Sequence, residues 1–90
     1  MVQVLILELS AQAQKDISFH KTSGNKAVLK KLLILLEEMG EHPFEGTGKP
    51  ELLKYNLAGY WSRRINREHR IVYEVTEEIV FVLSAKGHYD

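Results

Sequence analysis

The sheet of this protein is decided by residues 60–85, which have the sequence YWSRRINREHRIVYEVTEEIVFVLSA. Three runs rich in aromatic and β-branched residues follow one another there: Tyr60–Ile65, His69–Val75 and Ile79–Ala85. Such runs, with apolar and polar positions alternating, are typical of strands. The two connections between them have three residues each, and connections that short join antiparallel neighbours. The stretch therefore predicts an antiparallel meander.

A further strand and a long helix are predicted on the N-terminal side of this meander. Leu52–Tyr55 has a short strand pattern, and the preceding residues 42–50 contain two glycines and two prolines, which favour a loop. Before the loop, residues 26–39 carry one apolar stripe at helical spacing, formed by Val28, Leu32, Leu35, Leu36 and Met39. We expect this second helix to end at Gly40. Ile34 falls off the stripe, which suits either contact with another chain or a fuller core.

The N-terminal residues complete the order of elements. Alternating apolar residues predict a first strand over about residues 2–7, and Ser10 is a suitable N-cap for a first helix over residues 11–21. A strand, two helices and a meander make an α+β fold, with both helices packed on one face of a small antiparallel sheet. Ninety residues suffice for one hydrophobic core, so we expect a single domain over residues 1–90.

Composition excludes several classes of protein. The chain has no cysteine, which rules out disulfides and thiolate metal sites, and it has no apolar run near the roughly 20 residues that span a bilayer. The N-terminus has no basic region of the kind that opens a signal peptide. We therefore expect a cytoplasmic protein with no membrane partner. The net charge is zero, which argues against capture of nucleic acid by bulk positive potential.

The charge is nevertheless unevenly distributed. Residues 46–75 contain six basic and three acidic residues, a net charge of +3, so the rest of the chain carries −3. A local basic patch on a neutral protein suits contact with a few phosphates.

Three basic residues come from three consecutive predicted strands: Lys54, Arg64 and Arg70. On the sheet face opposite the helices they would form a compact cationic surface, with Glu51 at the start of the first of these strands. Clustered like charges favour an anion between them. The same residues also suit an ordinary solvent-exposed sheet face, so the pattern alone leaves both interpretations open.

The last three residues contain a histidine and a tyrosine, His88 and Tyr89. A terminal histidine is commonly a bystander, but the strongly apolar strand that precedes it would anchor the tail near the sheet. None of the four histidines shows metal-ligand spacing, so we expect no metal and no cofactor. No serine lies in a nucleophile-elbow context.

The C-terminal half closely resembles the YoeB (Txe) family of toxins in the RelE superfamily. The resemblance is carried by the run Pro43–Lys54 (PFEGTGKPELLK), by Asn56–Ile65 (NLAGYWSRRI), by Glu68–Tyr73 (EHRIVY) and by the final His88-Tyr89. In the N-terminal half only the order strand, helix, helix agrees.

The resemblance implies a function for the protein and roles for individual residues. It implies a RelE-like α+β ribonuclease that cleaves mRNA at the ribosomal A site, usually as a dimer, and is silenced by a cognate antitoxin. The family's general base falls on Glu51, its phosphate-stabilising arginine on Arg70, its general acid on His88 and its penultimate tyrosine on Tyr89. Basic positions that contact RNA fall on Lys49, Lys54 and Arg64.

Two other hypotheses remain at this point. A catalytically weak homologue could act only as an antitoxin-binding or autoregulatory module, which the neutral charge would suit. A ribonuclease that needs no ribosome would cleave naked RNA efficiently. Growth arrest relieved by the antitoxin, and cleavage mapped with and without ribosomes, separate these alternatives.

Overall fold

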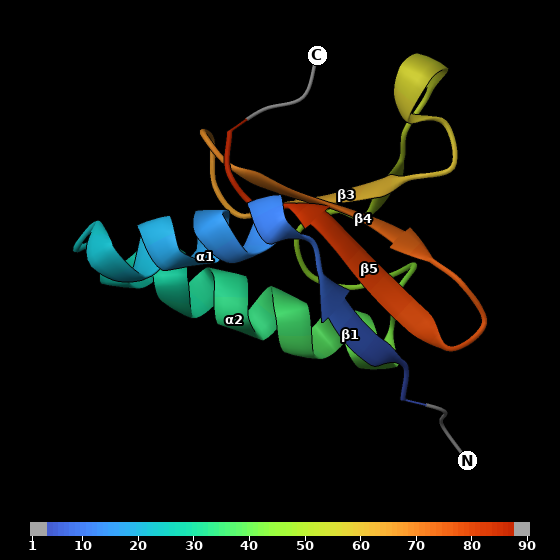
Figure 1. The fold of residues 1–90 in the computed structure, drawn as a ribbon, viewed down its shortest axis with the longest axis horizontal. Helices are drawn as coiled ribbons and strands as arrows, with labels where there is room; N and C mark the ends of the chain where they lie inside the picture. Colours follow the sequence, from blue (N-terminus) through green and yellow to red (C-terminus); the bar gives the residue numbers. More distant parts are fainter. Residues whose placement is uncertain (1–3, 88–90) are drawn as a thin grey trace.

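A five-stranded sheet with two helices on one face makes up the computed structural model, which describes residues 4–87 (Figure 1). The elements in chain order are β1 (Ile6–Leu9), α1 (Ala11–Thr22), α2 (Lys26–Glu41), β2 (Glu51–Leu52), the 3-10 turn η1 (Tyr55–Leu57), β3 (Trp61–Arg64), β4 (Arg70–Val75) and β5 (Ile79–Ser84). The strand order is β1-β5-β4-β3-β2. The predicted α+β class, with its strand-helix-helix-meander order, is confirmed.

The sheet is mixed rather than purely antiparallel. Strands β2 to β5 pair antiparallel as predicted, but β1 joins the edge of β5 in parallel, with Ile6 opposite Ile79. The tight turns of the meander force their strands to reverse direction, whereas most of the chain lies between β1 and β5 and leaves their relative direction free. The strand predicted over residues 2–7 is shifted, because β1 runs from Ile6 to Leu9.

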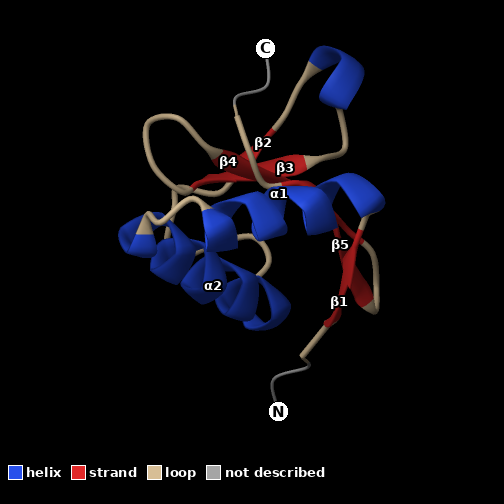
Figure 2. Ribbon diagram, turned by 60° about the vertical axis from the view of Figure 1, so that its left-hand side comes forward, coloured by secondary structure: helices blue, strands red, loops and turns tan. Residues whose placement is uncertain are grey.

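Both helices begin at polar caps. The Ser10 hydroxyl accepts a hydrogen bond from the Ala13 N–H at 2.9 Å, and the Asn25 amide oxygen accepts one from the Val28 N–H at 3.1 Å. Each cap satisfies a backbone donor that has no partner inside the helix. Figure 1 and Figure 2 show both helices on one side of the sheet.

The prediction that Gly40 ends the second helix is wrong, because α2 continues to Glu41. Gly40 is buried, and its carbonyl accepts a hydrogen bond from the Leu5 N–H at 2.8 Å. A Cβ at this position would lie 3.4 Å from the Leu5 carbonyl oxygen. Gly40 is therefore the point at which the N-terminal segment is hydrogen-bonded to α2.

The core lies between the helices and the inner face of the sheet. Its fully buried members are Ala13, Leu32, Leu35, Met39, Ile71, Tyr73, Val80, Val82 and Ala85. The α2 stripe predicted from the sequence supplies Val28, Leu32, Leu35 and Met39 to this cluster. No helix within residues 4–87 has both the length and the apolar character needed to cross a bilayer.

The strand predicted over Leu52–Tyr55 is wrong for its second half. Only Glu51 and Leu52 pair with β3, and the Leu53 N–H still donates to the Tyr60 carbonyl at 2.9 Å. The chain then turns, with Lys54 in the N-cap position of η1 and Tyr55 at φ 59°. Lys54 consequently does not lie on a strand.

Candidate active site

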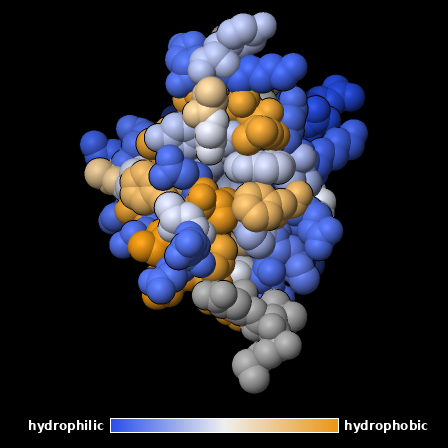
Figure 3. Space-filling view, turned by 90° about the vertical axis from the view of Figure 1, so that its right-hand side faces the viewer, coloured by the Kyte–Doolittle hydropathy of each residue, from blue (hydrophilic) through white to orange (hydrophobic). Residues whose placement is uncertain are grey.

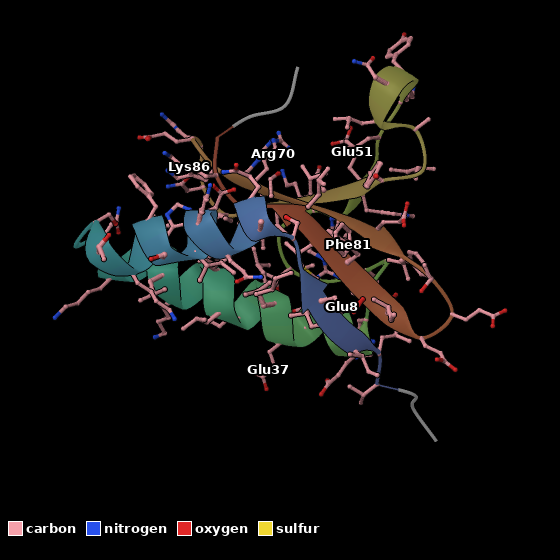
Figure 4. All side chains as sticks on the ribbon, in the orientation of Figure 1. Glu8, Glu37, Glu51, Arg70, Phe81 and Lys86 are labelled. Carbon is pink, nitrogen blue, oxygen red and sulfur yellow. The ribbon has the colours of Figure 1, made fainter. Side chains whose placement is uncertain are left out.

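The outer face of the sheet, opposite the helices, gathers a carboxylate and two guanidinium groups. Glu51 lies opposite Ser62 in the pairing of β2 with β3, and Arg64 lies opposite Arg70 in the pairing of β3 with β4. Since side chains alternate along a strand, Ser62 and Arg64 share one face, and their partners share it too. Figure 4 shows Glu51 and Arg70 both projecting on the side of the sheet away from α2.

The strand register gives the separation of Glu51 and Arg70 along the sheet. They stand two strands and two residues apart, which corresponds to about 12 Å between Cα atoms. Glutamate and arginine are both long side chains, so their polar ends can converge on a single phosphodiester. Of the four residues predicted to meet on this face, Glu51, Arg64 and Arg70 share it by strand register, whereas Lys54 follows β2 in the turn to η1.

The direct pairing of Arg64 with Arg70 has an electrostatic consequence. Side chains in directly opposite positions have Cβ atoms about 5 Å apart, and like charges so placed destabilise a sheet. An anion between the two groups converts that repulsion into attraction, and a guanidinium offers a planar pair of donors that matches two phosphate oxygens. The arrangement suits a phosphate.

Two of the predicted basic residues flank this face in hollows of the surface. Lys54 lines a hollow of about 400 Å³ together with Glu51 and the following residues to Leu57. Lys49 and Arg64 line a second hollow of about 450 Å³, where the Arg64 N–H donates to the Gly48 carbonyl at 2.7 Å. Two further cations, Lys31 and Arg67, line this second hollow. No acidic side chain borders it within the described residues.

Arg63 lies beneath the outer face and is fully buried. Its Nη1 donates to the Glu38 carboxylate at 2.9 Å, and its Nε donates to the Tyr73 hydroxyl at 3.1 Å. It also donates to the main-chain carbonyls of His42, Glu45 and Thr47. One guanidinium therefore fastens the loop before β2 to the underside of the sheet, and this loop leads directly into Lys49 and Glu51.

Two pKa values are shifted in this network. Burial alone would raise the pKa of the Glu38 carboxyl, but hydrogen bonds from Thr47 and Arg63 and the positive charge of Arg63 outweigh burial, so the pKa is lowered below 4.5. Burial raises the pKa of the Tyr73 hydroxyl, and Arg63 offsets only part of that rise. Glu38 is therefore ionised and paired at neutral pH, while Tyr73 is neutral and donates to the Pro43 carbonyl at 2.7 Å.

The end of β5 returns the chain to the start of β4. The Arg70 N–H donates to the Gly87 carbonyl at 3.1 Å, so the main chain of Gly87 lies beside Arg70. His88 and Tyr89, the other two predicted catalytic residues, lie outside the described residues.

Sequence reasoning missed the buried role of Arg63 and grouped it with the surface cations. A signal was present, because Trp61, Arg63 and Ile65 alternate along one strand and both flanking residues are large and apolar. Ile65 is buried and Trp61 packs against the core, so Arg63 faces inward with them. Within residues 4–87, no three His, Asp or Glu side chains come together as a metal site.

The fold is thus that of a small α+β protein whose outer sheet face carries the Glu51 carboxylate and the Arg64 and Arg70 guanidinium groups, side chains that can together hold a phosphate and accept a proton. Comparison with known proteins is more specific. The protein-family model that describes the YoeB-like toxin of bacterial type II toxin–antitoxin systems matches residues 9–89 of this chain. The chain belongs to this family of toxins.

Individual relatives agree in sequence and in fold. Toxin YoeB of Synechocystis is 48% identical over 78 residues, covering 82% of this chain and 91% of the relative. The structure of a YoeB dimer from Staphylococcus aureus has a TM-score of 0.82 and 43% identity, covering 94% of this chain and 98% of that one. YoeB in a heterotetrameric YoeB–YefM toxin–antitoxin complex from the same species has a TM-score of 0.81 and 43% identity, with the same coverage.

Proposed function

We propose that this toxin is a metal-independent endoribonuclease that cleaves mRNA in the ribosomal A site and so inhibits translation. The observation that carries the proposal is the common sheet face of Glu51, Arg64 and Arg70, which combines a proton acceptor with a phosphate site. RNA brings its own nucleophile, the 2′-hydroxyl. The protein then needs a base, an acid and cations to stabilise the pentacoordinate phosphate.

The proposed reaction distributes these roles among the predicted residues. The Glu51 carboxylate takes the proton of the 2′-hydroxyl while the 2′-oxygen bonds to the adjacent phosphorus. Arg70, with Arg64 beside it, stabilises the charge on the phosphate oxygens. The bond from phosphorus to the 5′-oxygen breaks, and His88 gives that oxygen a proton, leaving a 2′,3′-cyclic phosphate and a free 5′-hydroxyl.

Lys49, Lys54 and Tyr89 are assigned to the substrate. The two lysines border the hollows on either side of the sheet face, where they would contact the strand on both sides of the cut. Tyr89 stacks on a base or orients the phosphate.

The test compares cleavage by the parent with that of Glu51→Gln, Arg70→Ala and His88→Gln. Each positioned acid or base contributes about 10²–10⁴-fold, so each variant should lose activity on that scale while keeping the parent's urea midpoint. Glu77→Gln is a matched control, because Glu77 is exposed in the turn between β4 and β5. Three variants that arrest growth and cut mRNA like the parent would overturn the assignment.

Dependence on the ribosome is tested separately. Cut sites are mapped on one mRNA with and without translating ribosomes. We expect cuts at the A site on ribosomes and slow cleavage of the naked RNA. Equal rates on both would identify a ribosome-independent ribonuclease instead.

We further propose that a cognate antitoxin neutralises the toxin and that the toxin forms a homodimer. Exposed apolar side chains supply surface for such contacts: Ile6 on the edge strand β1, Val4 just before it, and Leu33 and Ile34 on α2. Figure 3 shows apolar side chains gathered among charged ones on the side that carries β1 and the β4–β5 turn. The YoeB–YefM complex and the YoeB dimer of the S. aureus relative support these partners.

Expression tests the antitoxin. Inducing this chain alone should arrest growth, and co-expression of the adjacent open reading frame should relieve the arrest. A chain that leaves growth unchanged but still binds the neighbouring gene product would be a binding module without ribonuclease activity.

A further inference from the structure

Side chains from distant parts of the chain hold the backbone that follows β5. The Ala85 N–H donates to the Asp16 carboxylate at 2.9 Å, and the Ala85 carbonyl lies 2.7 Å from His20 Nε2. Two residues later, the Gly87 N–H donates to His69 Nδ1 at 3.0 Å. We call Asp16, His20 and His69 the C-terminal clamp. It holds the main chain of residues 85–87 against α1 and the start of β4.

Two members of the clamp are polar groups in the protein interior. Asp16 is 4% exposed and His20 is 2% exposed, and both lie on the inner side of α1, four residues apart. Burying such groups costs free energy unless each finds a hydrogen-bond partner. Their partner is mainly Ala85, whose N–H and carbonyl they bind together, while Gln12 donates a second bond to Asp16 at 2.8 Å. An apolar pair would fill the same space, so packing alone does not explain these residues.

The hydrogen bonds fix the proton positions on both rings. A carbonyl only accepts, so His20 must donate through Nε2–H to Ala85; an N–H only donates, so His69 must accept from Gly87 through an unprotonated Nδ1. The two rings also meet edge to face, with centroids 4.7 Å apart. The His69 ring thus packs against His20, and its Nε2 also lies 3.8 Å from the Glu68 carboxylate.

Further contacts beside the C-terminal clamp hold the same residues 85–87. Lys86 Nζ lies 4.0 Å from the centroid of the Phe19 ring, a cation–π contact, and Phe19 packs edge to face on His20. The Gly87 carbonyl accepts from the Arg70 N–H. Each of residues 85, 86 and 87 is thus fixed by at least one contact, and the segment ends beside Arg70.

We propose that Asp16, His20 and His69 are positioning residues for cleavage: they fix the backbone of residues 85–87, which lies beside Arg70 and directly precedes the proposed general acid His88 in the sequence. The inference rests on the proposed ribonuclease function, and it assigns none of the three residues a contact with the substrate. A misplacement of about 1 Å at a reacting group can cost about 100-fold in rate. Binding of RNA, which depends on the cations of the outer face, is unaffected.

His69 offers the sharpest test, because its ring is partly exposed while Asp16 and His20 are in the core. His69→Leu removes the acceptor for Gly87, and His69→Asn keeps an oxygen in the place of Nδ1. We expect His69→Leu to lower kcat for cleavage by about 10- to 100-fold with KM little changed, and His69→Asn to restore most of it. Amide hydrogen exchange at Gly87 should be faster in His69→Leu than in the parent and in His69→Asn.

A double-mutant cycle separates positioning from general damage to the fold. If His69 acts only through His88, adding His69→Leu to His88→Gln should cost nothing further. His42→Leu is the matched control, because that histidine is half exposed beside Glu45 and does not touch residues 85–87. It should leave kcat and Gly87 exchange at the parent values.

The outcomes distinguish this inference from the proposed function. A parent protein that cleaves no RNA would overturn the function and the inference together. A parent that cleaves, with His69→Leu equally active despite faster exchange at Gly87, would overturn the inference alone. The inference alone would also be overturned if His69→Leu lowered kcat by the same factor in the parent and in His88→Gln. That pattern is expected of a residue that only supports the fold.

Discussion

At the scale of single residues, Arg63 joins several distant parts of the chain through one buried guanidinium. Its three nitrogens reach a carboxylate, a hydroxyl and three carbonyls. Lysine keeps the charge but has one nitrogen, so Arg63→Lys leaves several acceptors without a donor. We expect a loss of about 2–4 kcal/mol in the free energy of unfolding, measured by urea denaturation. Arg64→Lys, on the exposed neighbour, should change it by less than about 0.5 kcal/mol, and equal losses at both sites would contradict this.

Glu38 gives this network a dependence on pH. Its pKa is lowered in the folded protein, so its ionisation stabilises the fold above the ordinary carboxyl value of 4.5, and that stability is lost as the pH falls through the lowered pKa. The free energy of unfolding of the parent should therefore exceed that of Glu38→Gln by a constant amount near neutrality. The difference should shrink as the pH falls below 4.5. A difference that grows on acidification would show that the Glu38–Arg63 pair does not stabilise the fold.

At the scale of elements, the loop between α2 and β2 depends on a glycine. Gly46 has φ 115°, and a Cβ there would lie 1.8 Å from Glu38 Oε1, within the ion pair with Arg63. Gly24 also has positive φ, at 81°, but has open space around it. Gly24→Ala should therefore cost only the backbone strain of about 1–2 kcal/mol, and Gly46→Ala clearly more. Thermal unfolding of both variants measures the difference, and equal costs would mean that the loop can shift without breaking the ion pair.

The elements also show what the sequence could and could not predict. Helix α2 and strands β3 to β5 were predictable because their apolar residues recur at the helical or strand period, which local sequence alone sets. Three features were not predictable, because each depends on contacts between segments far apart in the chain. They are the parallel pairing of β1, the end of α2 beyond Gly40 and the turn at Lys54. The same distinction between local pattern and distant contacts applies to the candidate active site. The common face of Glu51, Arg64 and Arg70 and the inward position of Arg63 both follow from strand alternation, whereas the burial of Asp16 and His20 depends on which segments cover them.

At the scale of the whole molecule, zero net charge means that the proposed RNA substrate would be attracted by local groups of cations rather than by a long-range field. The cations that line the hollow beside Arg64, among them Lys31 and Arg67, form such a local group. A neighbouring hollow of about 350 Å³ shares Lys31 and continues toward the start of α2. The cations of these two hollows are Lys31, Lys49, Arg64 and Arg67, and we expect them to bind phosphates of the proposed RNA substrate.

Salt dependence of binding tests this expectation. In a Glu51→Gln background that cannot cleave, Lys31→Gln with Arg67→Gln should weaken binding of labelled single-stranded RNA. The slope of log K against log salt should become shallower by about 0.7 for each phosphate that the protein no longer neutralises. Lys15→Gln with Lys30→Gln removes the same charge from exposed helix positions that do not line the hollow. Because long-range attraction depends only on total charge, an equal effect of both pairs would show that net charge governs binding. A weakening confined to the first pair would place the RNA strand in the hollow.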